Sequence, residues 1–289
     1  MTAVKNARYL SRPRGDEPLI AAQPRQLIVT IFGLYAREEQ NWLSIAAVVR
    51  LMAELGVDSQ AVRSSISRLK RRDSLRSQSV GGVAGYALSP SMVEVLHEGD
   101  QRIFDQDRPS LADGWVQVVF TVPETERGKR HELRTRLARL GFGPVAPGVW
   151  LAPGRLAGEV REMLSRRQLA GYVDIFRSEY LGYAELPGRV RDWWDLEDLA
   201  DRYGQFVAHY RPVLRRVGRG AAPAGDGAAF AEYVRMLTAW RRLRYLDPGL
   251  PAEVLPARWA GVPAAELFGQ LSEVLRPLAH RHAMAAIRG

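Results

Sequence analysis

Hydrophobic and polar positions along the chain follow two periods, one typical of helices and one typical of strands. In the first hundred residues apolar positions recur every three or four residues, with Ser44 and Asp58 at two N-caps and Gly56 at a helix end. Two short alternating runs follow, joined by a glycine-rich turn at 81–85. The pattern predicts helices over 24–34, 45–55, 59–72 and 90–104, an extended piece at 41–43, and strands at 75–80 and 86–88.

A different alternation begins at Trp115, where WVQVVFTV is typical of a buried strand. The following pattern predicts strands at 115–122, 141–145, 149–151 and 172–180, with helices at 127–140 and 156–169. This β-α-β-β-α-β order is typical of a ferredoxin-like domain.

The rest of the chain is mostly helical, with helices predicted over 191–217, 228–246 and 264–286. We therefore expect an α+β fold with several domains. The predicted parts are a flexible N-terminal arm at 1–23, a winged helix-turn-helix domain at 24–107, a ferredoxin-like middle domain at 108–182 and a helical C-terminal domain at 183–289.

Three helices followed by a two-stranded ribbon form a winged helix-turn-helix, whose third helix enters the DNA major groove. On that helix Val62, Ile66 and Leu69 form one apolar stripe, and the opposite face is polar. Between Gln60 and Arg72 there are five basic residues and no acidic one. Such side chains can contact base edges and phosphates. The predicted DNA-binding residues are Ser59, Gln60, Arg63, Ser64, Ser67, Arg68, Lys70, Arg71, Arg72 and Arg76.

Composition narrows the function classes. The 289 residues include no cysteine, which excludes disulfides, thiolate metal sites and a thiol nucleophile. The net charge of +9 fits a nucleic-acid partner, although only three of the 41 basic residues are lysines and this arginine bias is typical of a GC-rich genome. The N-terminus lacks a signal-peptide core and no window is apolar enough to span a membrane, so we expect a cytoplasmic protein with no membrane partner.

Three stretches give the chain a resemblance to a known family. They are PRQLIVTIFGLYAR with NWLSIAAVVRLMAELGVDSQAVRSSISRLKRRD (24–73), WVQVVFTVPETERGKRHELRTRLARLGFGPVAPGVWLAP (115–153) and LRYLDPGLPAEVLPARWAG (243–261). In content and order they resemble the PaaX-type repressors of bacterial phenylacetate degradation. The resemblance implies a homodimeric transcriptional repressor that binds a double-stranded DNA operator and releases it when a coenzyme A thioester such as phenylacetyl-CoA binds.

The wing departs from the family pattern. Family wings commonly carry several arginines, but no basic residue stands between Ser77 and Tyr86, and Arg76 lies only at the base. We therefore expect phosphate contacts from elsewhere, and Arg8, Arg12 and Arg14 of the N-terminal arm are one hypothesis.

A coenzyme A thioester presents phosphates and an apolar acyl group, so its site needs basic residues beside aromatic ones. The predicted effector-binding residues are Trp240, Arg241, Arg242, Arg244 and Tyr245. We expect no catalytic residue, metal site or cofactor. The basic helix at 127–139 is open to three interpretations: a DNA-backbone surface, an effector-phosphate surface or a solvated face.

Two alternatives stay open at this point. A metal-dependent nuclease could use the ferredoxin-like domain, but the first acidic residue after its first strand is Glu124, beyond Thr121-Val122-Pro123. A small-molecule-binding protein with a vestigial winged helix is the other, since the wing is poor in arginine.

Overall fold

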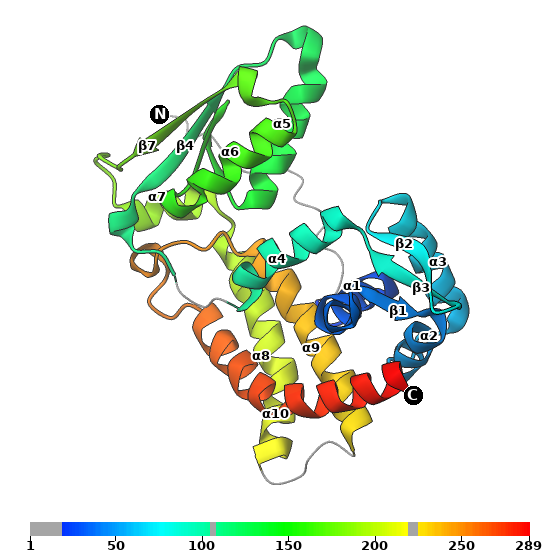
Figure 1. Ribbon diagram of the computed structural model, residues 1–289. Helices are drawn as coiled ribbons and strands as arrows, with labels where there is room; N and C mark the ends of the chain where they lie inside the picture. Colours follow the sequence, from blue (N-terminus) through cyan, green and yellow to red (C-terminus); the bar gives the residue numbers. More distant parts are fainter. Residues whose placement is uncertain (1–18, 105–107, 219–224) are drawn as a thin grey trace. The chain divides into compact units, whose positions relative to one another are not determined.

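The structure is a computed structural model that describes residues 19–104, 108–218 and 225–289 (Figure 1). The arm arginines Arg8, Arg12 and Arg14 lie outside these residues. The chain forms two compact units. Within the described residues, the winged-helix unit comprises 19–104, 203–218, 225–242 and 261–289, and the sheet unit comprises 108–202 and 243–260.

The winged-helix unit begins with three helices and a three-stranded sheet. Its N-terminal elements are α1 (Pro24–Leu34), η2 (Ala36–Glu39), β1 (Trp42–Ser44), α2 (Ile45–Glu54), α3 (Ser59–Arg71), β2 (Leu75–Val80), β3 (Val83–Leu88) and α4 (Pro90–Phe104). The strand order is β1-β3-β2 and both pairings are antiparallel. The predicted helices and the ribbon are confirmed, with one difference: β3 begins at Val83, not at residue 86, because the turn uses only Gly81 and Gly82.

Four further helices lie in the C-terminal part of the described chain. They are α7 (Leu186–Trp193), α8 (Leu196–Gly218), α9 (Asp226–Leu246) and α10 (Gly261–Arg288). In the winged-helix unit, the buried ring of Trp240 stacks on Phe268 at 4.7 Å between centroids. The indole N–H of Trp240 donates to the Ile103 carbonyl at 2.9 Å. Parts of α8, α9 and α10 therefore share one core with the N-terminal helices.

The sheet unit contains the predicted β-α-β-β-α-β order, which confirms the α+β fold class. Its elements are β4 (Trp115–Phe120), α5 (Arg127–Leu140), β5 (Gly143–Ala146), β6 (Val149–Pro153), α6 (Ala157–Arg166) and β7 (Val173–Ser178). The antiparallel strands lie in the order β5-β6-β4-β7, and α5 and α6 cover one face (Figure 1). Val116 and Val118 of β4 pack with Leu133 and Leu137 of α5 in the core between the sheet and the helices.

The prediction of a single helix over 191–217 is wrong, because α7 and α8 are separate helices. Trp194 between them is extended (φ −129°, ψ 139°), and its indole N–H donates to the Gly141 carbonyl at 2.9 Å. Asp195 then accepts a hydrogen bond from the Asp198 amide and caps α8. Burial of the Trp194 ring against the sheet overrides the continuous helical pattern, since a side chain on a straight helix would be directed elsewhere.

Candidate nucleic-acid interface

Local contacts fix α3 as a separate, well-capped helix. The Asp58 carboxylate accepts hydrogen bonds from the amides of Gln60 and Ala61 at 2.9 and 2.8 Å. Val62, Ile66 and Leu69 are buried, as the apolar stripe predicts. The opposite face is therefore the one that α3 presents to solvent.

An Asp58→Ala variant is expected to lower the free energy of unfolding by about 1 kcal/mol, because two amides of the first turn lose their acceptor. Urea denaturation followed by far-UV circular dichroism measures this loss. Asp58→Asn is the control and should retain most of the stability, since asparagine also caps helices. An unchanged midpoint for Asp58→Ala would contradict the capping role.

All ten residues predicted to bind DNA are exposed. The six basic residues among them fall into two groups by their side-chain contacts. Lys70 Nζ donates to Ser77 Oγ of the wing at 2.7 Å, and Arg76 Nε lies 3.3 Å from Asp73 Oδ1. The second group, Arg63, Arg68, Arg71 and Arg72, makes no ion pair or hydrogen bond with any residue that the structure describes. Four guanidinium groups on one short helix are thus available to an anionic ligand.

The wing is a tight hairpin with an apolar tip. Val80 pairs with Val83 across a two-residue turn, in which Gly81 and Gly82 have φ of 57° and 80°. Positive φ at both central positions is the type I′ arrangement that glycine favours. The two valines are 42% and 52% exposed. The wing tip therefore offers surface for van der Waals contact but no charge for a phosphate.

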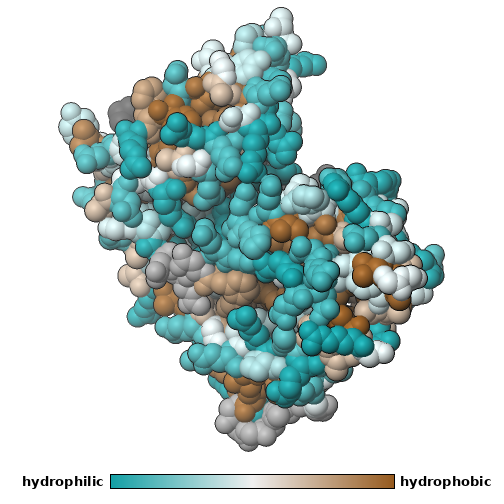
Figure 2. All heavy atoms as spheres, viewed as in Figure 1, coloured by the Kyte–Doolittle hydropathy of each residue, from teal (hydrophilic) through white to brown (hydrophobic). Residues whose placement is uncertain are grey.

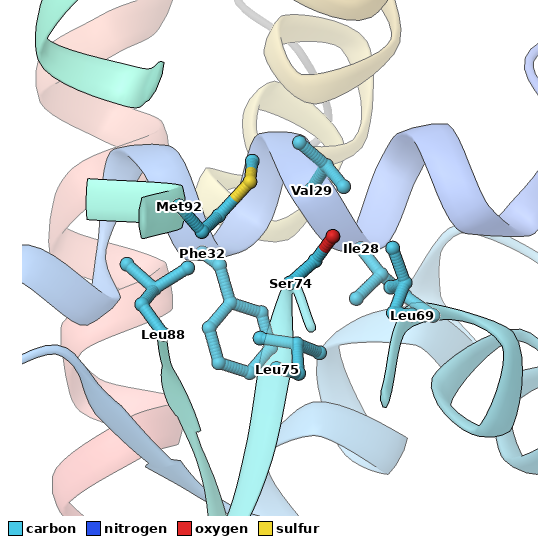
Figure 3. A pocket seen from close by; sticks show the side chains of 8 residues that line it. All are labelled: Ile28, Val29, Phe32, Leu69, Ser74, Leu75, Leu88 and Met92. Carbon is cyan, nitrogen blue, oxygen red and sulfur yellow. The ribbon is translucent and has the colours of Figure 1, made fainter. Parts of the chain in front are cut away.

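An apolar seam joins α3 to the wing (Figure 3). The lining side chains converge from α1, the end of α3, both wing strands and the start of α4, and they leave no room for a ligand. They are Ile28, Val29, Phe32, Leu69, Ser74, Leu75, Leu88 and Met92. Because this seam is part of the core, it packs the end of α3 against the base of the wing.

The structure distributes the predicted effector-binding residues over both units. Trp240 is a core residue with 1% exposure. Arg241 and Arg242 are half-buried and donate to the backbone carbonyls of Gln26 and Leu19 at 3.3 and 2.9 Å. Arg244, half-buried, and Tyr245, 42% exposed, belong to the sheet unit.

A set of contacts between α10 and the winged helix could not be predicted from the sequence pattern. His280 Nε2 lies 2.9 Å from Glu38 Oε2, and His282 Nε2 lies 2.6 Å from Glu54 Oε2. Arg50 also donates to the Ala286 carbonyl at 2.8 Å. The two histidines point to different elements, which agrees with their spacing of two on a helix. These contacts join α10 to η2 and to α2, the helix that precedes α3.

The acidic residues after β4 form hydrogen bonds with side chains of the same domain. Glu124 Oε2 accepts from Arg130 at 3.0 Å, and Glu126 Oε1 accepts from the Tyr172 hydroxyl at 2.8 Å. Across the described part of the chain there is no group of three or more His, Asp or Glu residues that could hold a metal ion. None of the helices in that part is both long and apolar enough to cross a bilayer.

Comparisons with known proteins show which family models and which curated protein the chain is similar to. Three family models match consecutive parts of the chain: a PaaX-like protein model (residues 23–92), the PaaX protein central Cas2-like domain (108–190) and the PaaX-like protein C-terminal domain (194–285). The transcriptional repressor PaaX of Escherichia coli (strain K12) is 26% identical over 258 residues, covering 88% of this chain and 80% of that protein.

A solved structure also matches over most of its length. The uncharacterized protein Rv0674 from Mycobacterium tuberculosis superposes with a TM-score of 0.57 at 20% identity, covering 91% of this chain and 98% of that one. At this identity the match supports the fold alone. It confirms that the α+β arrangement described above occurs in a second protein.

Proposed function

Because this chain belongs to the PaaX family of transcriptional regulators, we propose that it is a repressor whose α3 reads the sequence of an operator. The similarity to a transcriptional repressor indicates a regulator and not an enzyme, so the nuclease alternative is not favoured. A repressor that binds an operator has double-stranded DNA as its partner, and we therefore expect this protein to act in the cytoplasm.

One observation carries the proposal. Arg68 and Arg71 lie on the side of α3 away from the buried stripe, and Arg63 and Arg72 flank that side. None of these four side chains has a partner among the described residues. Arginine is the side chain that most often recognises guanine in the major groove, through a bidentate pair of hydrogen bonds. Ser59, Gln60, Ser64 and Ser67 share the exposed surface of the helix and would contact adenine edges or phosphates.

The proposed repressor is a homodimer. Two copies related by a two-fold axis would present two α3 helices to successive major grooves on one side of the duplex. The operator is then an inverted repeat whose half-sites are separated by about one or two helical turns. Size-exclusion chromatography with light scattering, with and without a DNA duplex, measures the stoichiometry directly.

An acyl-coenzyme A thioester is the proposed effector, with Arg241, Arg242 and Arg244 as ligands for its phosphates. Support comes from the family resemblance and from the sequence, in which three arginines stand within five residues of Tyr245. Trp240 would contribute indirectly, since its side chain is buried in the core.

A variant with Arg241→Ala, Arg242→Ala and Arg244→Ala is expected to keep operator affinity but to lose release by acyl-coenzyme A. Fluorescence anisotropy of a labelled operator, titrated with phenylacetyl-CoA, measures this response. The matched Lys triple variant should keep part of the response, because lysine also binds phosphate. A normal response in the Ala triple would remove these residues from the proposal, while thermal unfolding checks that the variant is folded.

Footprinting upstream of the protein's own operon tests the central proposal. We expect protection of an inverted repeat, and loss of that protection with one member of a panel of acyl-coenzyme A thioesters. Binding without sequence preference would favour a small-molecule-binding protein with a vestigial winged helix.

A further inference from the structure

A cluster of arginines lies outside the winged helix, on the α5–α6 face of the sheet unit. Helix α5 carries six basic residues and one acidic residue, Glu132. Arg136, Arg139 and Arg167 come together where α5 lies beside the end of α6, and Glu132 is 3.8 Å from Arg136. On the face of the molecule drawn in Figure 2, this part shows hydrophilic side chains together with a hydrophobic patch.

The side chain of Arg136 lies close enough to Arg139 and Arg167 for their positive charges to act on it. The Arg136 side chain is only 28% exposed. Its burial, followed by the positive charges of Arg167 and Arg139, lowers the pKa of Arg136 below its ordinary value. The side chains of Arg139 and Arg167 are exposed and make no ion pair or hydrogen bond with any described residue. A single carboxylate at 3.8 Å leaves most of this positive charge uncompensated.

We propose that Arg136, Arg139 and Arg167 bind phosphates of the DNA backbone flanking the operator, so that the sheet unit is a second DNA-contacting surface. The inference rests on the proposed function, since it presumes that the chain binds DNA. Guanidinium groups match phosphate oxygens in geometry and charge. The wing supplies no cation between Ser77 and Tyr86, so phosphate contacts that flank the recognition helix need another source.

The test compares two triple variants of the full chain with the same loss of charge. The first is Arg136→Gln, Arg139→Gln, Arg167→Gln. The control, Arg177→Gln, Arg191→Gln, Arg258→Gln, removes three exposed arginines from the same unit. Affinity for a long operator duplex is measured by anisotropy from 50 to 200 mM salt. Each lost phosphate contact lowers the slope of log affinity against log salt by about 0.9.

If all three arginines contact phosphates, the wild-type protein should lose about 40-fold more affinity over this salt range than the first variant. The control should follow the wild type. The loss should be equal on operator and on random duplexes, because backbone contacts carry no sequence information. An Arg136→Lys, Arg139→Lys, Arg167→Lys variant should retain most of the salt dependence and shows that the Gln effect is one of charge.

Three results would overturn the inference. The first is an unchanged slope in the folded Gln variant, and the second is an equal change in the control. The third is normal DNA binding by the Gln variant with a lost response to phenylacetyl-CoA, which would assign the cluster to the phosphates of a small ligand. Failure of the proposed function looks different, since the wild-type protein would then show no preference for the operator and an Arg68→Ala, Arg71→Ala variant would change nothing.

Discussion

An Arg68→Ala, Arg71→Ala variant is expected to weaken specific operator binding by roughly 2–6 kcal/mol, because each arginine that reaches a base edge contributes about 1–3 kcal/mol. Both side chains are exposed on α3 and have no competing partner among the described residues, so no internal ion pair has to be broken before they bind. Competition anisotropy with operator and random duplexes at one fixed salt concentration distinguishes contacts to bases from contacts to phosphates.

The control removes the same number of positive charges from another helix of the same unit. Arg215 and Arg216 are exposed on α8, and their replacement by alanine should leave the ratio of operator to random affinity unchanged. An equal loss on both duplexes for the α3 variant would show that Arg68 and Arg71 contact only phosphates. No loss at all would remove α3 as the recognition helix.

The second large effect concerns stability. An Arg108→Ala variant is expected to lower the free energy of unfolding by about 3–5 kcal/mol, because it leaves a buried carboxylate without its cation. Arg108 lies 2.8 Å from Asp247, whose side chain is 2% exposed. Asp247 also accepts from the Gly249 amide, and Arg108 donates to the Leu250 carbonyl at 3.1 Å. Removing the cation thus disturbs a whole turn.

Chemical denaturation followed by tryptophan fluorescence measures this loss, since Trp259 lies under the Arg108 guanidinium at 5.9 Å. Arg130→Ala is the matched control. Its ion pair with Glu124 is exposed on both sides, so the change should cost less than about 1 kcal/mol. A loss of similar size in both variants would mean that burial of the Asp247 carboxylate has little effect.

Local pattern was sufficient to predict most elements and which face of α3 is buried. Ser44 and Asp58 cap α2 and α3 as their positions predict, and the stripe of Val62, Ile66 and Leu69 orients α3 correctly. These features depend on residues within one or two turns of each other, so the sequence contains the information directly.

Contacts between distant segments could not be predicted in the same way. His282 and Glu54 are 228 residues apart, and Thr30 and Thr238, whose hydroxyls lie 2.8 Å apart, are separated by 208. The break before α8 has the same origin, since it depends on where Trp194 meets the sheet. Local sequence periodicity cannot predict such contacts, because they depend on how distant elements pack against each other in three dimensions.

The buried partners of the N-terminal helices have a consequence for how this protein can be divided. Trp240, Thr238 and Arg235 of α9 bond to Ile103, Thr30 and the Leu55 carbonyl, all within the winged-helix unit. A fragment that ended after α4 would expose this apolar and polar surface to water. The segment from α1 to α4 is therefore not an independent module, and a chimaera that grafts it onto another protein must carry α9 with it.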